Sequence, residues 1–332
     1  MRCTNSYLRG KRILSVFLAF AMLLSMTACG KAEYEMAYST DMAVSGFSVV
    51  DKQESGMADG FAAELCVVTD NVTDGVSVDM ENAHAAVLFD VTDKEVIYSK
   101  NAHDSLYPAS LTKVMTALVA LKYGSMDQVL VASNSVNISE SGAQLCGLKQ
   151  GDKMTLNQAL YILLMYSAND VAMLIAENVG GSVEHFVELM NEEAKAIGAT
   201  NSNFVNPHGL SADNHYTTAY DLYLIFNEAL QQNGFLEIIS TTNYETTFSD
   251  KNGKAKQLSF QNSNLYLRGN YTAPENITVV GGKTGTTSAA GHCLLLLSKD
   301  SAGNPYISVI LRSESRDLLY TEMSDLLDEI SK

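Results

Sequence analysis

Basic residues are scarce in this chain of 332 residues: 22 lysines and arginines stand against 38 aspartates and glutamates, for a net charge of −16. Because nucleic-acid binding requires a basic surface, this deficit argues against a nucleic-acid partner. The six histidines form no ligand motif, so the sequence predicts no metal site and no cofactor. The proportion of hydrophobic residues, 46%, is ordinary for a globular protein of one large or two modest domains.

Cysteine is also sparse, with five residues in the chain. Cys3 and Cys29 lie in an N-terminal targeting segment, which leaves Cys66, Cys146 and Cys293. An odd number without metal-like spacing predicts neither a disulfide framework nor a zinc site. Cys293 begins an apolar run, where it is expected to be a small buried side chain.

The apolar run near the N-terminus, Ile13–Leu24, is too short to span a bilayer comfortably. It follows a positively charged segment, which is typical of a signal peptide. The next residues, SMTACG, resemble the lipobox of bacterial lipoproteins, with Met26 where leucine is commoner. This predicts that residues 1–28 are a lipoprotein signal peptide and that Cys29 is lipidated. The alternative is an ordinary secretory signal cut near Ala28.

The mature chain is predicted to have two parts. Residues 29–80 are acidic, carry many small and polar side chains and show no sustained periodicity, so we expect a flexible tether. Within the tether, the apolar patch 61–68 is expected to have some local order. Residues 81–332 are expected to form the folded domain.

Strands are predicted at both ends of this domain, with helices between them. The apolar runs 85–89 and 96–98 flank a polar turn and predict a β-hairpin. Helical spacing and capping signals such as Thr155-x-x-Gln158 predict the central helices. Those helices are expected at 111–123, 156–177 (interrupted at 167–169), 182–197 and from 218. Three strands (277–280, 293–297, 306–311) and a helix (318–330) follow. The pattern predicts one sheet built from both termini, with a helical subdomain inserted.

Ser110 and Lys113 stand at the start of the helix predicted from Leu111. A spacing of three places both side chains on one face, one turn apart. A serine becomes a strong nucleophile when a neutral amine takes its proton, and burial or a nearby cation lowers a lysine pKa. The helix N-terminus also favours negative charge at Ser110. Because Ser-x-x-Lys is common by chance, an ordinary exposed first turn is the alternative.

Two further motifs follow in the chain. Ser167-Ala-Asn169 supplies a hydroxyl and an amide at the predicted break between helices, although Ser-x-Asn also occurs at 135–137. Lys283-Thr-Gly285 ends a predicted strand, where a lysine and a threonine hydroxyl can meet an anion and glycine leaves room for a substrate backbone. Alone, this motif also reads as a strand-end turn. In this order, with separations of 57 and 116 residues, the three motifs are far more specific.

With these motifs, the chain resembles the low-molecular-weight penicillin-binding proteins, the serine D-alanyl-D-alanine carboxypeptidases of peptidase family S11. The resemblance runs from about Ala83 to the C-terminus. It rests on the stretches PASLTK (108–113), NPHGL (206–210), TAYD (218–221) and GKTGTTSAAG (282–291). It implies an α/β (α+β) fold of the β-lactamase/D,D-peptidase type, in which helices flank an antiparallel sheet and an all-helical subdomain is inserted.

The resemblance also implies catalytic roles for four side chains. Ser110 would attack the carbonyl of the penultimate D-alanine of a peptidoglycan stem pentapeptide, and Lys113 would accept its proton. Ser167 would relay a proton to the leaving D-alanine. Asn169 would hold Lys113 and the substrate backbone. Water would then hydrolyse the acyl-enzyme.

The resemblance implies binding roles around the third motif. Lys283 would keep the site positive and hydrogen-bond Ser167, Thr284 would bind the terminal carboxylate, and Gly285 would leave space for the substrate. The backbone N–H groups of Ser110 and Thr286 would form the oxyanion hole.

Two further positions near the site carry expectations. Relatives place a carboxylate-binding arginine near the end of the last strand, where this chain offers Arg312 and Arg316, and the sequence does not choose between them. His208 is expected to shape the pocket wall rather than to act as a base.

Three alternatives stay open beside the carboxypeptidase: a D,D-endopeptidase, a serine β-lactamase and a non-catalytic penicillin-binding sensor lipoprotein. The stretch 201–210 contains no acidic residue, which disfavours a class A β-lactamase because that class needs a loop glutamate. The implied partners are peptidoglycan stem peptides, β-lactams as covalent inhibitors and the membrane through the lipid on Cys29. The implied location is extracytoplasmic, anchored to the cell membrane and facing the cell wall.

Overall fold

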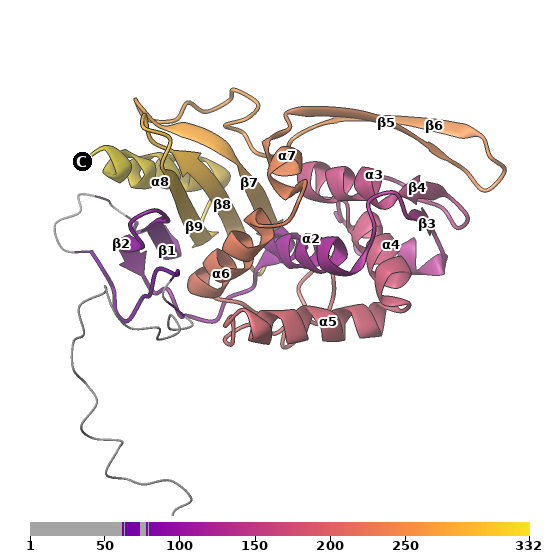
Figure 1. The fold of residues 1–332 in the computed structure, drawn as a ribbon, viewed down its shortest axis with the longest axis horizontal. Coiled ribbons are helices and arrows are strands. Elements are labelled where there is room, and N and C mark those ends of the chain that lie inside the picture. Colours follow the sequence, from indigo (N-terminus) through magenta and orange to yellow (C-terminus); the bar gives the residue numbers. More distant parts are fainter. Residues whose placement is uncertain (1–61, 63, 74–77, 79) are drawn as a thin grey trace, which may run out of the picture. The chain divides into compact units, whose positions relative to one another are not determined.

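The computed structural model of the chain describes residues 62, 64–73, 78 and 80–332 (Figure 1). The predicted signal peptide, the predicted lipidation site at Cys29 and most of the predicted tether lie outside the described residues. Among the described residues, no helix is both long enough and apolar enough to cross a membrane.

The main sheet combines strands from both ends of the domain, as predicted, in the order β2-β1-β9-β8-β7. Every neighbouring pair is antiparallel. The strands are β1 (Ala83–Asp90), β2 (Glu95–Lys100), β7 (Thr278–Thr287), β8 (Gly291–Lys299) and β9 (Pro305–Ser313). β7 is an edge strand, so one side of its backbone is available for pairing with another chain.

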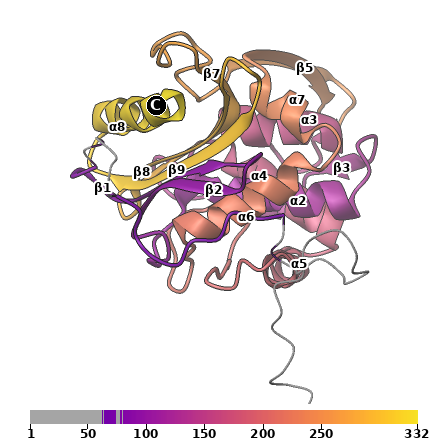
Figure 2. The ribbon, with the colours of Figure 1, turned by 60° about the vertical axis from the view of Figure 1, so that its left-hand side comes forward.

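Both faces of the main sheet are buried. Figure 2 shows helix α8 (Arg316–Asp328) on one face and α6 (Ala219–Leu230) on the other. Alternate side chains of β1 supply the two sides: Val87 and Phe89 face the core beneath the helical region, whereas Ala86 and Leu88 face α8. This explains why the strands read as nearly continuous apolar runs.

The central region is mainly helical, as predicted. Thr155 and Gln158 form the expected capping box. Ser182 caps the helix that begins at Val183, and Thr218 caps the helix that begins at Ala219. The helices are α2 (Thr112–Tyr123), α3 (Leu156–Tyr161), α4 (Asn169–Gly180), α5 (Val183–Ala196) and α7 (Phe235–Ser240), with a π-turn η4 (Ile162–Tyr166). Short 3₁₀ turns are η2 (Ala109–Leu111), η3 (Asn134–Val136) and η5 (Glu329–Ser331).

A second sheet, which the sequence analysis did not predict, lies in the inserted region. Its order is β3-β4-β5-β6. The strands are β3 (Val129–Val131), β4 (Lys153–Thr155), β5 (Asn243–Ser249) and β6 (Ala255–Gln261). The inserted region is therefore not all-helical, and the β5–β6 hairpin projects from it as a long arm (Figure 1).

The described part of the predicted tether packs on the folded domain. The Cys66 backbone N–H donates to the Tyr223 hydroxyl at 3.0 Å, and Val72 pairs with Ser99 of β2. The apolar patch gives the reason, because Cys66 and Val68 are buried. The folded unit thus begins before residue 81. Cys66, Cys146 and Cys293 are free thiols, and burial raises the pKa of Cys293 to about 12.

Candidate active site

The structure brings Ser110 and Lys113 together at the junction of η2 and α2. Lys113 Nζ lies 2.9 Å from Ser110 Oγ and donates to Asn169 Oδ1 at 2.7 Å. The backbone carbonyl of His208 accepts a further hydrogen bond from the same amine. Lys113 has no exposed surface, whereas Ser110 is half-buried and lines a cleft. The arrangement therefore presents the hydroxyl to a ligand and keeps the amine away from water.

Backbone geometry holds the serine loop in one place. Ala109 precedes Ser110 in left-handed backbone with φ of 47°, which is strained for a residue with a side chain. Its carbonyl accepts from Thr112 Oγ1 at 2.9 Å, and Thr112 Oγ1 also lies 2.9 Å from His215 Nε2. A Cβ at Gly209 would lie 1.9 Å from the Ala109 oxygen, so only glycine fits there. These contacts orient the first turn that carries Ser110.

Ser167 and Lys283 form the opposite side of the cleft. Ser167 ends the π-turn in left-handed backbone, φ 67°, which breaks the helix and turns its hydroxyl toward β7. Lys283 Nζ, fully buried, donates to Ser167 Oγ at 2.9 Å and to the Thr284 carbonyl at 2.7 Å. Two serine hydroxyls thus each face a buried lysine amine.

The two lysines have lowered pKa values. Burial, together with the nearby charge of Lys283, lowers the pKa of Lys113 well below its ordinary value, although Asp170 opposes this. Burial lowers the pKa of Lys283 to about 7. Because the charge of Lys283 disfavours a second charge on Lys113, the Lys113 amine is the one that is readily neutral. A neutral amine beside Ser110 can act as a base.

The strand β7 lies against the serine turn. A Cβ at Gly285 would lie 3.1 Å from both the Ser110 nitrogen and the Pro108 oxygen, so glycine permits this close approach. Thr284 is half-buried, and its hydroxyl donates to Ser263 Oγ at 2.8 Å. The exposed Thr286 follows at the rim of the cleft. The free edge of β7 and the first turn of α2 therefore form two walls of one groove.

The cleft between these elements has a volume of about 480 Å³. Asp170 fixes its outer loop by accepting backbone N–H bonds from Cys146, Gly147 and Leu148 at 2.8–3.0 Å. Lys113 and Lys283 lie beneath its floor. The residues that line it are Ser110, Gly142, Ala143, Gln144, Tyr166, Ser167, Asn169, Gly209, Leu210, Gln261, Asn262, Ser263, Arg268, Thr284, Gly285, Thr286, Thr287 and Arg316. Among these described residues, the only charged side chains at its surface are two arginines.

The two arginines considered for carboxylate binding, Arg312 and Arg316, lie in different places. Arg316, the first residue of α8, lines the cleft, whereas Arg312 lines two other pockets behind the serine turn. Arg268 also lines the cleft and was not predicted. The candidate for carboxylate binding is therefore Arg316, not Arg312.

His208 supports the site through its backbone. Burial lowers the pKa of the His208 side chain to about 3, and its Nδ1 accepts from the Leu210 N–H at 3.1 Å. Thr116 Oγ1 donates to the Pro207 carbonyl at 2.6 Å, so two successive carbonyls of this loop bind α2. The NPHGL loop thus covers Lys113 and holds it through a backbone carbonyl.

Four cleft residues were not predicted from the sequence: Ser263, Arg268, Gln144 and Tyr166. Ser263 follows β6, a strand that was not predicted, and the other three stand in no motif. Among the described residues, no group of three or more His, Cys, Asp or Glu side chains could hold a metal ion.

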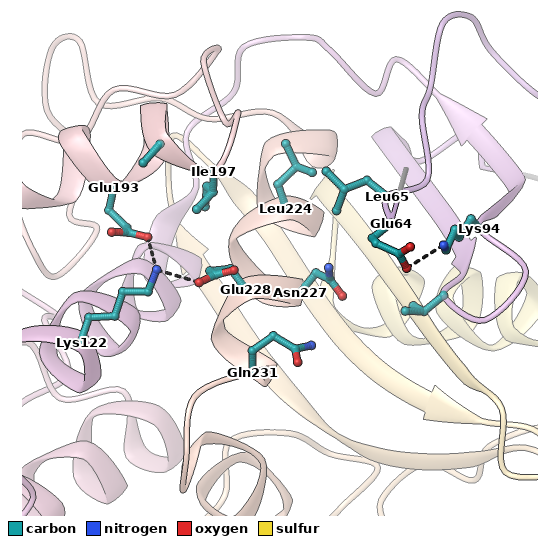
Figure 3. A pocket seen from close by; sticks show the side chains of 12 residues that line it. Glu64, Leu65, Lys94, Lys122, Glu193, Ile197, Leu224, Asn227, Glu228 and Gln231 are labelled. Atoms are coloured by element: carbon teal, nitrogen blue, oxygen red, sulfur yellow. Dashed lines mark hydrogen bonds and ion pairs between the residues drawn. The ribbon is translucent and has the colours of Figure 1, made fainter. Parts of the chain in front are cut away.

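A larger pocket, of about 700 Å³, lies away from the three motifs (Figure 3). Lys122 of α2 bridges Glu193 and Glu228 at its edge, and Lys94 pairs with Glu64 at 2.6 Å. Burial opposes protonation of Lys122, but the hydrogen bonds to these glutamates raise its pKa. With its charges paired and none of the motif residues present, this pocket offers no catalytic constellation.

Known proteins share both the sequence and the fold. A family model described as D-alanyl-D-alanine carboxypeptidase matches residues 72–315. The D-alanyl-D-alanine carboxypeptidase DacF of Bacillus subtilis is 33% identical over 65% of this chain and 54% of its own length. DacC of Escherichia coli is 32% identical over 80% of this chain and 63% of its own length. The chain thus spans between half and two thirds of these relatives.

Two other similarities bear on function and fold. A D-alanyl-D-alanine endopeptidase of Pseudomonas aeruginosa is 35% identical over 67% of this chain and 69% of its own length. The crystal structure of the Streptomyces K15 DD-transpeptidase superposes with a TM-score of 0.70 at 24% identity, covering 76% of this chain and 98% of that one. At this identity the structural likeness establishes the fold, an α/β arrangement with antiparallel sheets.

Proposed function

Because the chain belongs to the D-alanyl-D-alanine carboxypeptidase family, we propose that it is a serine peptidase that removes the terminal D-alanine from peptidoglycan stem pentapeptides. One observation carries the proposal: a fully buried amine with a strongly lowered pKa, Lys113, lies 2.9 Å from the hydroxyl of Ser110 at the floor of an open cleft. Such a pair can activate a serine without a histidine or a carboxylate.

Acylation begins when Ser110 Oγ attacks the carbonyl carbon of the penultimate D-alanine. Lys113 Nζ takes the hydroxyl proton as the bond to carbon forms. The backbone N–H groups of Ser110 and Thr286 stabilise the oxyanion. Gly285 supports this role, because its lack of a side chain lets β7 lie close to the Ser110 nitrogen.

The bond to the terminal D-alanine then breaks, and the leaving amine needs a proton. Ser167 supplies it, with Lys283 at 2.9 Å as the group that replaces that proton. Asn169 fixes Lys113 through its side-chain oxygen, which leaves its amide N–H₂ for the substrate backbone. Water enters the open cleft and hydrolyses the ester on Ser110, which releases the shortened peptide.

The terminal carboxylate of the substrate binds at the end of β7. Thr284 donates its hydroxyl, and Arg316 supplies a positive charge from the first turn of α8. Ser263 accepts from the Thr284 hydroxyl at 2.8 Å and fixes its rotamer. A carboxylate would take that hydrogen bond in the complex. β-Lactams carry a carboxylate and a reactive carbonyl, so they would acylate the same serine.

A D,D-endopeptidase is the second candidate, because the Pseudomonas relative bears that name at 35% identity. It would use the same residues on a cross-linked peptide. The outcome depends on which peptide reaches the cleft, not on the chemistry at Ser110.

The proposed location is outside the cytoplasm, on the cell membrane and facing the wall where the substrate lies. The sequence supports lipid anchoring through Cys29 after removal of residues 1–28, with residues up to about 61 as the link to the folded unit. Because residues 64–73 pack on the folded domain, the proposed boundary between tether and domain moves from residue 81 to before residue 64.

Labelling with a fluorescent penicillin tests the nucleophile. We expect a covalent adduct on the peptide that contains Ser110, and no adduct in Ser110→Ala. Slow loss of the adduct is expected for a peptidase, whereas rapid turnover of penicillin would indicate a β-lactamase. Undiminished labelling of Ser110→Ala would place the nucleophile elsewhere.

A further inference from the structure

Arg312 occupies an unusual backbone position in the main sheet. It lies near the end of β9 in left-handed conformation, with φ of 56°. Here β9 contains one more residue than β8, because His292 pairs with Ser313 while Leu294 pairs with Ile310. Such bulges redirect a side chain, and a bulky residue with positive φ is strained. Glycine would take this conformation without that strain.

The side chain of Arg312 is exposed and makes no ion pair or side-chain hydrogen bond with another described residue. Arg312 and Ala289 line two neighbouring pockets, of about 310 and 500 Å³. A strained arginine whose guanidinium pairs with no described residue is more readily explained by a ligand than by packing.

The smaller pocket has a rigid aromatic wall. Leu106 and Thr217 form an antiparallel bridge with N–O distances of 2.8 and 3.0 Å, which sets Tyr107 opposite Tyr216. Both tyrosines are 37% exposed. Burial lowers the pKa of His215, behind them, to about 4, so it is uncharged at neutral pH. Among the described residues that line this pocket, Arg312 is therefore the only charged one.

This combination fits one class of ligand. A guanidinium without a partner binds a carboxylate through two parallel hydrogen bonds. Two fixed tyrosines offer apolar faces with polar tips for an amphipathic group such as a sugar ring or a short peptide. Peptidoglycan is a repeating polymer of sugars that carry short stem peptides, and those peptides bear carboxylates.

The pocket is joined to the proposed active site through two short segments. Tyr107 stands three residues before Ser110, and Ala289 and Ala290 form the turn that follows the end of β7. A polymer whose stem peptide lies in the catalytic cleft has further stem peptides and sugars nearby. A second site on the other side of the serine turn can hold one of them.

We propose that Arg312, Tyr107 and Tyr216 form an accessory site that binds a carboxylate-bearing segment of peptidoglycan, separate from the segment that reacts at Ser110. The proposal rests on peptidoglycan being the substrate. The site would raise the local concentration of stem peptides from polymeric substrate without touching the reacting atoms.

The test uses a disaccharide tripeptide fragment of peptidoglycan, whose stem ends before both D-alanines and which therefore lacks the reactive bond. Calorimetry with the wild-type protein and Arg312→Gly compares their affinities. We expect binding to wild type and a loss of about tenfold or more in Arg312→Gly, as for a charge-assisted hydrogen bond. The melting temperature of Arg312→Gly should be unchanged or higher, because glycine relieves the backbone strain.

Lys94→Gly is the matched control. Lys94 is also a cation in left-handed backbone, with φ of 59°, but it lies at the β1–β2 turn and lines a different pocket. Its replacement removes the same charge and should leave fragment affinity at the wild-type value. Three results would each overturn the proposal. The fragment could bind all three proteins with equal affinity, it could fail to bind wild type, or an equal concentration of acetate could displace it fully.

Release of D-alanine separates this proposal from the proposed function. Arg312→Gly should cleave a soluble, sugar-free pentapeptide at the wild-type rate but process intact peptidoglycan more slowly. If no protein releases D-alanine yet the fragment still binds through Arg312, the enzyme assignment fails and the accessory site stands. If cleavage of soluble and polymeric substrate is equally unaffected, the accessory site is wrong and the enzyme assignment stands.

Discussion

At the scale of single residues, the site depends on two lysines that have no exposed surface. Burial of a charged amine costs free energy unless the amine loses its proton or finds hydrogen-bond partners. Lys113 shows the first solution and Lys283 the second. Lys113 has the strongly lowered pKa that a base requires, while Lys283 lies between a serine hydroxyl and a backbone carbonyl. Their proximity matters because the charge of Lys283 lowers the pKa of Lys113 further.

Replacing Lys283 tests this coupling. The charge of Lys283 is the second cause, after burial, of the lowered pKa of Lys113. Lys113 must be neutral to accept a proton, so acylation slows as pH falls below its pKa in the folded protein. Lys283→Met removes the charge, raises the pKa of Lys113 and should move the acid limb of penicillin acylation to higher pH. An acid limb that stays in place would show that the two amines are not coupled.

Thr284 should contribute to binding and not to activation of the nucleophile. Thr284→Val is expected to lower kcat/KM by roughly 10- to 100-fold for substrates with a free terminal carboxylate, the value of one charge-assisted hydrogen bond. An amide-capped partner substrate should be insensitive to this change. Lys113→Ala should reduce both, by about 10²–10⁴-fold for loss of the base. Equal damage to both substrates by Thr284→Val would make that threonine structural.

The residues of the three motifs were predicted from sequence, because each motif combines side chains whose chemistry is recognisable at short spacing. Ser263 and Arg268 were not, because nothing in the local sequence indicates what they face. Ser263 reaches Thr284 only because the β5–β6 hairpin returns the chain to the end of β7. Contacts that fold topology creates between distant segments leave no periodic pattern.

At the scale of elements, the helices and the main sheet were predictable and the second sheet was not. The helices carry capping residues such as Thr155 and Ser182, and the main strands carry long apolar runs. By contrast, β3 and β4 have three residues each, and β5 and β6 carry mainly polar residues on strands with one exposed face. A sequence in which weakly hydrophobic and polar residues alternate is hard to distinguish from the sequence of a loop.

The packing of the NPHGL loop on the serine turn gives a prediction at this scale. Gly209→Ala would strain a residue with φ of 84° and also place a Cβ 1.9 Å from the Ala109 oxygen. Gly181→Ala has similar strain, φ 79°, but no atom within 4 Å of the new Cβ. We expect Gly181→Ala to cost about 1–2 kcal/mol of unfolding free energy and to keep penicillin labelling.

Gly209→Ala should cost more than this and abolish labelling, since the serine turn must move to accommodate the methyl group. Chemical denaturation and penicillin labelling of both variants provide the comparison. Equal stability and equal labelling would mean that the loop does not position Ser110.

At the scale of the whole molecule, charge is unevenly distributed. The chain has a net charge of −16, yet the described lining of the cleft contains Arg268 and Arg316 and no carboxylate, with two lysines beneath it. A positive recess in an acidic protein favours an anionic ligand. The overall composition argues against a nucleic-acid partner, and the local composition of the cleft indicates a negatively charged substrate.

The anchor is also a property of the whole chain. Cys29→Ser should release the protein from membranes and stop incorporation of labelled fatty acid, because stable attachment requires two or more acyl chains. Fractionation of cells that produce each protein provides the measurement. Retention of the variant on membranes, with labelled fatty acid still incorporated, would contradict lipidation at this cysteine.

The central claim is tested most directly by incubating the protein with a stem pentapeptide that ends in D-Ala-D-Ala and measuring free D-alanine. We expect one D-alanine per peptide, a tetrapeptide product and no release by Ser110→Ala. Absence of D-alanine from the wild-type reaction while penicillin labels Ser110, or undiminished release by Ser110→Ala, would contradict it.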